Sequence, residues 1–431
     1  MYRNDFKKAG WINSTNVYEV NLRQYTPGGT FGEFAGELPR LKDMGVQTLW
    51  FMPLTPISEK NRKGTLGSYY ACSDYTAINP EFGTAEEAKA LFRQAQAMGF
   101  TIMIDWVANH TGWDHRWTNE HPGYYQRDEG TGDFKKASGM DDIIELDYDN
   151  PQLRRDMISA MAYWIDEFGI DGFRCDLAFW VRLDFWKEAR TELEKKKTLF
   201  WLGELDPIDN PDYFEVFDAA YTWQWMTAAS GFYHEHTSIT LLKRLLEKYA
   251  AICGNEHLPL WFTSNHDENS WNGTEYEKYG DMARLLAVFS FTWNGIGLIY
   301  SGQELPNTAR LEFFERDPIP WGNFHALHDF YATLLTLKTT HPALRSADAS
   351  VYTEWIPTGD APLLCYARNN GKEQVIVLLN LGTEPQRVRL PFPGMTVCKD
   401  IFSGEETEYQ EGEITELVAW EYRVLVKQNR Q

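Results

Sequence analysis

The sequence is poor in cysteine, in long apolar runs and in positive charge. Its cysteines are widely spaced, odd in number and without a Cys-x-x-Cys pair: Cys72, Cys175, Cys253, Cys365 and Cys398. This pattern argues against a disulfide framework and a zinc signature, and it favours a reducing compartment. No apolar run reaches the ~18 residues of a membrane-spanning helix, and no apolar segment of a signal peptide follows residues 1–8. We therefore expect a cytoplasmic location for the chain as written, or a secreted or periplasmic one if a leader was removed.

Acidic residues outnumber basic ones, 62 to 41, which gives a net charge of −21. This charge argues against nucleic acid, anionic membranes and acidic substrates as partners, and it suits a neutral substrate. Aromatic residues are plentiful at 15%, with 17 Trp. They predict either a large core or a groove whose rings stack on apolar ligand faces. The composition leaves the oligomeric state open.

A unit of helix, glycine and apolar strand recurs along the first part of the chain. Glycine at the end of a helix supplies the left-handed cap needed before the chain turns into a strand. Apolar strands that alternate with amphipathic helices predict a parallel sheet covered by helices. The units are residues 31–52 with Gly45, residues 85–105 with Gly99 and residues 153–174 with Gly169.

Further apolar runs extend the series to eight strands with helices between them. Eight such units predict an α/β fold, a (β/α)₈ TIM barrel. A doubly wound open sheet is the alternative, but no glycine-rich phosphate loop follows the first strand. The additional strands are expected at residues 17–25, 198–205, 219–223, 259–263 and 296–301.

Two segments interrupt the alternation and define the domains. Residues 111–149 are rich in Gly, Asp, His and Trp and lack a helical period, so we expect a small excursion domain after the third strand. Residues 346–431 carry short strands separated by Gly, Pro and Asn, which predicts a C-terminal antiparallel β-sandwich. The catalytic barrel then takes residues 1–110 and 150–345.

Charged and polar residues follow four of the predicted strands. In a barrel of this type, functional groups gather at the carboxyl ends of the strands. A single carboxylate there is more often a cap or a surface group, whereas four clusters at the same end indicate a site. The clusters are Asp105 to His110, Arg174 to Asp176, Glu204 to Asp206, and Ser264 to Glu268.

Several carboxylates with few other reactive groups indicate glycoside hydrolysis or transfer. Arg174 and Asp176 lie on the same side of a strand, so the guanidinium is expected to lower the pKa of Asp176 and to keep it ionised, as a nucleophile, a metal ligand or a structural ion pair. Glu204 ends an apolar strand, and burial is expected to raise its pKa so that it donates a proton. The remaining candidates are Asp267, as a third acid, and His110 and His266, as donors to sugar hydroxyls.

These residues stand in stretches that resemble the α-amylase family, glycoside hydrolase family 13. The stretches are 70–83, 105–110, 147–148, 172–176, 202–204, 265–267 and 295–304, in the order expected for the family. The resemblance implies a barrel with an excursion domain and a C-terminal β-sandwich. It implies retention of the α configuration through a covalent glycosyl–Asp176 intermediate, and retention predicts a carboxyl separation of ~5–5.5 Å between Asp176 and Glu204. It also implies the remaining site residues: Asp267 as the third catalytic acid, and Tyr70, Asp105, His110, Arg174 and His266 in substrate binding.

The chain departs from the family at several positions. Phe179 and Trp180 stand where many α-amylases have a Lys-His pair, and Tyr69 replaces a glycine. Asn109 matches a calcium ligand of the family. Calcium binding is one alternative for the acidic residues of the excursion, and solvated loop charges are the other: Asp133, Asp141, Asp142 and Asp147.

Three functions remain open at this point. The first is an α-amylase that cleaves internal α-1,4-glucosidic bonds of starch or maltooligosaccharides. The second is an oligosaccharide-processing relative, namely a cyclomaltodextrinase or maltogenic amylase, an α-glucosidase or a 4-α-glucanotransferase, and Phe179 and Trp180 favour this group. The third, an inactive glycan-binding barrel, is disfavoured because all three carboxylates are present.

Overall fold

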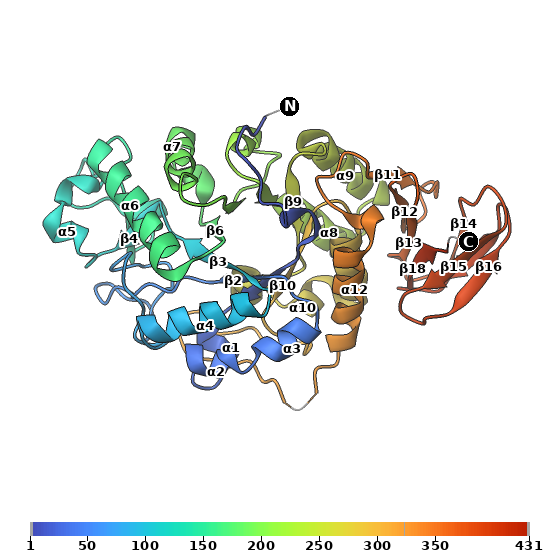
Figure 1. Ribbon diagram of the computed structural model, residues 1–431, viewed down its shortest axis with the longest axis horizontal. Helices are drawn as coiled ribbons and strands as arrows, with labels where there is room; N and C mark the ends of the chain where they lie inside the picture. Colours follow the sequence, from blue (N-terminus) through green and yellow to red (C-terminus); the bar gives the residue numbers. More distant parts are fainter. Residues whose placement is uncertain (1–2, 323, 429–431) are drawn as a thin grey trace.

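The computed structural model describes residues 3–322 and 324–428 and consists of a barrel flanked by a small lobe and a β domain (Figure 1). Parallel strands close the barrel in the order β1-β10-β9-β8-β7-β6-β3-β2. Their bounds are β1 Val17–Val20, β2 Thr48–Phe51, β3 Thr101–Trp106, β6 Gly172–Cys175, β7 Phe200–Gly203, β8 Ala219–Tyr221, β9 Leu258–Trp261 and β10 Ile296–Tyr300. The predicted TIM barrel is confirmed.

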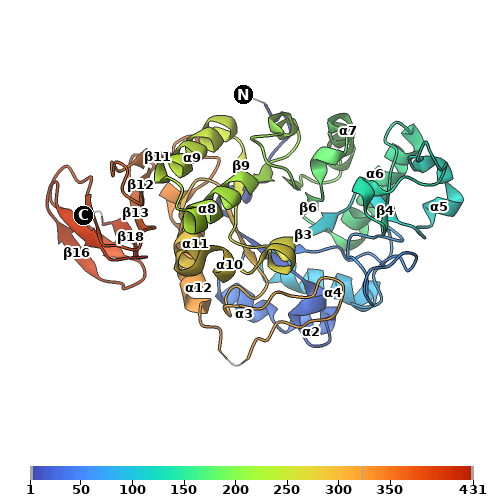
Figure 2. The ribbon, with the colours of Figure 1, turned by 180° about the vertical axis from the view of Figure 1, so that it is seen from behind.

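Helices surround the barrel, and their ends show how the sequence places them (Figures 1 and 2). A capping box of Thr84 and Glu87 starts α4, and the side chain of Asn150 accepts backbone N–H groups at the start of α6. Gly169 ends α6 with φ 66°, as predicted for a glycine cap. The helices are α1 Leu22–Tyr25, α2 Phe31–Ala35, α3 Leu38–Asp43, α4 Ala85–Ala97, α5 Trp117–Glu120, α6 Pro151–Phe168, α7 Leu183–Leu193, α8 Trp223–Glu235, α9 Ile239–Cys253, α10 Glu275–Tyr279, α11 Ala283–Thr292 and α12 His328–Thr340.

Two predicted elements near the N-terminus are wrong in length. The strand expected over residues 17–25 ends at Val20, and the following residues form α1, which is as fully buried as the strand although it contains Arg23 and Gln24. The helix expected over residues 31–44 is broken into α2 and α3. Pro39 lies in the first turn of α3, where its missing N–H is tolerated, but it could not continue α2.

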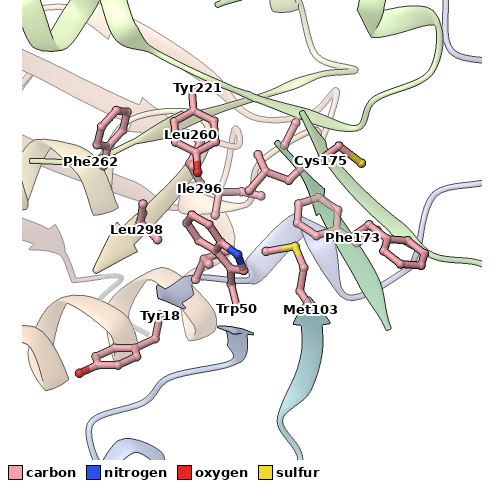
Figure 3. Packing of buried hydrophobic residues seen from close by; sticks show 14 of the residues in the cluster. Tyr18, Trp50, Met103, Phe173, Cys175, Tyr221, Leu260, Phe262, Ile296 and Leu298 are labelled. Atoms are coloured by element: carbon pink, nitrogen blue, oxygen red, sulfur yellow. The ribbon is translucent and has the colours of Figure 1, made fainter. Parts of the chain in front are cut away.

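Large apolar side chains pack inside the barrel and around its strands (Figure 3). Trp50 on β2 is fully buried, and its ring lies edge-on to Tyr221 of β8 with the centroids 6.4 Å apart. Such packing forms a rigid, water-free floor. Any charged group placed directly above it therefore pays a desolvation penalty.

The remaining strands form the two appendages. In the excursion, β4 (His110–Gly112) pairs antiparallel with β5 (Ile143–Glu145). The C-terminal domain has a six-stranded sheet, in the order β11-β12-β13-β18-β15-β16, and a two-stranded sheet of β14 and β17, with an apolar core between them. Its strands are β11 Tyr352–Trp355, β12 Leu363–Asn369, β13 Gln374–Asn380, β14 Gln386–Arg389, β15 Thr396–Asp400, β16 Glu406–Tyr409, β17 Ile414–Leu417 and β18 Tyr422–Lys427.

Two predictions from composition can be compared with the structure. All five cysteines are buried and free, so none takes part in a disulfide. Within residues 3–322 and 324–428, no helix has the length and apolar character needed to cross a membrane.

Candidate active site

The carboxyl ends of neighbouring strands bring the predicted acidic residues together around one arginine. Asp105 of β3 stands in register with Arg174 of β6, and the backbone N–H of Glu204, just after β7, donates to the carbonyl of Cys175. Parallel strands that end at the same rim place the residues that follow them side by side. The structure thus assembles the clusters that the sequence predicted from separate strands.

Arg174 is fully buried and contacts three carboxyl groups. Its Nη1 lies 3.0 Å from Oδ1 of Asp105 and 2.8 Å from Oδ1 of Asp176, and its Nη2 lies 2.9 Å from Oε2 of Glu204. The guanidinium also stacks over the Trp50 ring, 5.0 Å from its centroid. A single positive charge cannot neutralise three carboxylates in a dry site, so the cluster favours keeping a proton.

The pKa values of the two central carboxyls are raised to different extents. Burial raises the pKa of Glu204 to about 7; Arg174 opposes the shift, and the neighbouring Asp176 adds to it. Burial also raises the pKa of Asp176 to about 6, again against Arg174. Arg174 lowers the pKa of Asp176, as predicted, but desolvation outweighs the ion pair, so the net pKa lies above the usual value instead of below it. The order nevertheless holds: Asp176 loses its proton before Glu204 does.

The contacts of Glu204 indicate which of its oxygens carries the proton. Oε2 accepts the backbone N–H of Leu177 at 2.8 Å and faces Nη2 of Arg174. The donated N–H of Leu177 and the nearby positive charge of Arg174 favour negative charge on Oε2 and leave Oε1 as the oxygen that is protonated. Leu177 presents its N–H from a left-handed conformation, φ 39°, which is strained for a branched side chain.

A second chain of hydrogen bonds begins at Glu19, a buried residue of β1 that the sequence analysis did not select. Nδ1 of His266 lies 2.5 Å from Oε1 of Glu19, and its Nε2 lies 2.6 Å from the hydroxyl of Tyr70, which in turn donates to Oδ2 of Asp105. Burial lowers the pKa of His266, but Asp267 and Glu19 outweigh burial and raise it to about 9. His266 is therefore doubly protonated at neutral pH, and its two N–H groups donate to Glu19 and Tyr70.

A cavity of about 350 Å³ opens above these groups. Tyr70, His110, Asp176, Glu204 and Asp267 line it. Further walls come from the excursion and from the loops after β2, β6, β9 and β10: Lys63, Ser68, Met140, Asp142, Ile143, Leu177, Trp271, Phe313 and Phe314. This volume suits a small ligand. Five of the predicted site residues therefore meet at one hollow.

His110 offers the cavity a neutral ring. Burial lowers its pKa to about 4. The side-chain amide of Asn109 lies 3.4 Å from Nδ1 and can only donate to it, which leaves the proton on Nε2. A hydrogen bond to the backbone of Tyr70 opposes part of this lowering, and contact between His110 and a ligand hydroxyl stays a prediction.

Three of the predicted substrate-binding residues lie behind the cavity wall. Asp105, Arg174 and His266 are buried and are absent from the cavity lining. Their contacts go to the residues that do line it, so they support the site from below. Direct contact between these three side chains and a substrate stays a prediction.

Two of the acidic residues of the excursion form ion pairs with lysines. Asp142 pairs with Lys63 at 2.7 Å and Asp141 with Lys136. Among residues 3–322 and 324–428, no cluster of three or more His, Cys, Asp or Glu side chains is arranged to hold a metal ion. Calcium binding at Asn109 stays a prediction, and no step below depends on it.

Phe179 and Trp180 form an exposed aromatic pair close to the carboxyls. They lie in a short helical turn directly after Asp176 and Leu177, and they are 40% and 38% exposed. The hydroxyl of Tyr213 donates to the backbone carbonyl of Phe179 at 3.2 Å, which fixes this turn. Neither ring lines the cavity, and exposed rings of this kind can stack on apolar ligand faces.

Comparisons with known proteins agree with this geometry. A sequence model described as alpha amylase, catalytic domain, matches residues 10–136 and 123–317. Alpha-amylase 2 of Dictyoglomus thermophilum is 26% identical over 412 residues, with 90% of this chain and 69% of that protein covered. An α-amylase of Haloarcula japonica is 27% identical over 423 residues, with 94% of this chain and 60% of that protein covered. The chain thus spans between 60% and 69% of the length of these two relatives.

Two crystal structures are similar over nearly the whole chain. An α-amylase from Lactobacillus plantarum is 28% identical with a TM-score of 0.86, and the match covers 96% of this chain and 99% of that one. A maltogenic α-amylase from Thermotoga neapolitana is 26% identical with a TM-score of 0.88, and the match covers 97% of this chain and 99% of that one.

Proposed function

Because the chain belongs to the α-amylase family of glycoside hydrolases, we propose that it cleaves internal α-1,4-glucosidic bonds of starch or maltooligosaccharides with retention of configuration. The observation that carries this proposal is the pair of carboxyls at the cavity. Asp176 and Glu204 share one buried guanidinium, and the pKa of Glu204, about 7, lies above that of Asp176, about 6. One acid is thus suited to attack and the other to donate a proton.

The proposed reaction has two steps. In the first, a carboxylate oxygen of Asp176 forms a bond to the anomeric carbon, the glycosidic bond breaks, and Oε1 of Glu204 gives its proton to the departing oxygen. In the second, Glu204 takes a proton from water, the water oxygen bonds to the anomeric carbon, and Asp176 leaves as a carboxylate. Asp267, at the cavity edge, stabilises the positive charge of the transition state.

The supporting residues hold this arrangement in place. Arg174 and the N–H of Leu177 keep Oε2 of Glu204 occupied, so Oε1 remains available for proton transfer. Charged His266 orients the Tyr70 hydroxyl, and the Tyr70 ring forms one wall of the cavity. The Tyr70 ring can therefore stack on the sugar next to the cleaved bond.

A second candidate is an oligosaccharide-processing relative: a cyclomaltodextrinase or maltogenic amylase, an α-glucosidase or a 4-α-glucanotransferase. The observation in its favour is the exposed pair of Phe179 and Trp180 in place of the Lys-His pair of many α-amylases. Apolar rings favour the stacking of a sugar acceptor or a curved substrate over charged contacts with the leaving group.

Product analysis separates the candidates. Purified protein is incubated with soluble starch, maltoheptaose, β-cyclodextrin, pullulan and isomaltose, each with and without a chelator, and a Glu204→Gln variant serves as the blank. Rapid loss of starch viscosity with a spread of maltooligosaccharides supports the α-amylase. Preference for cyclodextrin, release of single glucose units, or growth of longer chains assigns the enzyme to the second group. No turnover of any of these glucans contradicts the proposed function.

A further inference from the structure

A second hollow, separate from the catalytic cavity, lies where the barrel meets the C-terminal domain. Its volume is about 660 Å³, and no residue lines both this hollow and the catalytic cavity. On one side are the end of α8 and the start of α9, and on the other are loops of the C-terminal domain (Figure 2). We call it the Trp420 groove and define it by its aromatic and polar lining: Tyr233, Thr237, Asp360, Glu384, Gln386 and Trp420.

Trp420 is held in the groove by an unusual backbone conformation. It lies in the short turn between β17 and β18 with φ 59°, a left-handed conformation that glycine or asparagine normally supplies. Its ring remains half-buried, and its centroid lies 6.0 Å from that of Tyr233 on α8. Strain of this kind is more common at functional sites than elsewhere, and here the surrounding structure holds it in place.

The polar lining has the character of a sugar-binding surface. Asp360, Glu384 and Gln386 supply planar carboxylate and amide groups, which can accept from or donate to hydroxyl groups. Among the described lining residues there is no Lys or Arg, and the imidazoles of His234 and His236 add further groups that can hydrogen-bond to hydroxyls. The hydroxyl oxygen of Thr237 is buried and lacks a hydrogen-bond partner in the described part of the chain. A neutral ligand rich in hydroxyls suits the carboxylate and amide groups of this lining.

We propose that the Trp420 groove is a second glucan-binding site, in which the Trp420 and Tyr233 rings stack on the apolar faces of glucosyl units of an α-glucan. The proposal rests on the proposed function, because an enzyme that acts on a polymer meets the same ligand at both sites. The site holds a neighbouring segment of the polymer and raises its local concentration at the catalytic cavity. Short substrates that fill only the catalytic cavity gain nothing from it.

The test measures glucan binding in full-length protein that carries Glu204→Gln, so that the polymer stays intact. Migration in native gels is compared with and without amylopectin, and calorimetry with maltoheptaose counts the sites. Trp420→Asn removes the ring while asparagine tolerates the left-handed backbone, so the fold is kept. Loss of one stacked ring is expected to weaken polymer binding about tenfold. Phe324→Asn, which removes an aromatic ring that is 77% exposed and lies outside the groove, is the matched control.

Two further measurements keep the result interpretable. Thr237→Val removes only the unpaired hydroxyl and is expected to weaken binding in the same direction. In the active background, Trp420→Asn is expected to raise the KM for starch and leave kcat/KM for an aryl maltoside unchanged. The groove proposal is overturned if Trp420→Asn is retarded by amylopectin as strongly as the Phe324→Asn control and binds maltoheptaose at the same number of sites. Failure of the proposed function is a different result, because then the unsubstituted protein releases no sugar from any glucan.

Discussion

Replacement of the general acid gives the most detailed prediction. In Glu204→Gln the shape is kept and the N–H of Leu177 still has an oxygen to donate to, but no proton can reach the departing oxygen. General acid catalysis contributes about 10²- to 10⁴-fold. For starch or an aryl maltoside with a poor leaving group, we therefore expect kcat/KM to fall by about 10²- to 10⁴-fold.

The leaving group decides whether this loss appears. Fluoride departs from α-maltosyl fluoride without a proton, and kcat/KM reports only the steps up to the first irreversible one. The kcat/KM of Glu204→Gln for the fluoride is therefore expected to stay within about tenfold of the unsubstituted value. Glu59→Gln, which makes the same chemical change at an exposed residue, controls for the substitution itself. Equal losses with both substrates would refute the assignment of Glu204 as the acid.

The pH dependence follows from the same two groups. Activity requires Asp176 ionised, so it rises with pH through about 6, and it requires Glu204 protonated, so it falls with pH through about 7. The correctly protonated form is therefore expected to be most abundant between these two values and to decline on either side. With maltosyl fluoride the fall above neutral pH is expected to disappear. A persistent fall would place the basic limb on another group.

Three further predictions concern the supporting structure. Glu19→Gln removes the carboxylate that stabilises the charged form of His266, so the pKa of His266 is expected to fall from about 9. Activity should then decline more steeply at high pH than in the unsubstituted protein. An unaltered pH profile would contradict this role of Glu19. The double variant Phe179→Ala, Trp180→Ala removes two exposed rings and leaves the core covered, so the unfolding temperature is expected to stay the same. Transfer to sugar acceptors is expected to decrease relative to hydrolysis, which chromatography of the products measures. Gly169→Ala strains a left-handed helix end with open space around it, and denaturant unfolding is expected to report a loss of about 1 kcal/mol.

Local patterns predicted the architecture well because they depend on neighbouring residues. The helix end at Gly169 and the carboxylates after the strands could be placed from the order of residues alone. The break between α2 and α3 was missed although Pro39 signals it, because the apolar period continues across the break. The first strand was predicted to be too long because the residues of α1 are as buried as those of the strand before it.

The electrostatics of the site could not be predicted in the same way. The ion pair of Arg174 and Asp176 was visible in the sequence, but the pKa of Asp176 depends on burial by elements far away in the chain. Glu19 was overlooked because its partner, His266, lies at the other end of the barrel sequence. Its only signal was a single charged residue inside the apolar run of the first strand. Desolvation and long-range pairing are properties of the folded molecule.

The most direct test of the account is to trap the covalent intermediate. A fluorinated maltosyl fluoride that reacts quickly and is released slowly is incubated with the enzyme, and the peptides are then mapped by mass spectrometry. The account predicts one glycosyl group, attached to Asp176. A label on Glu204 or Asp267, or no label while the first product released has the β configuration, would contradict it.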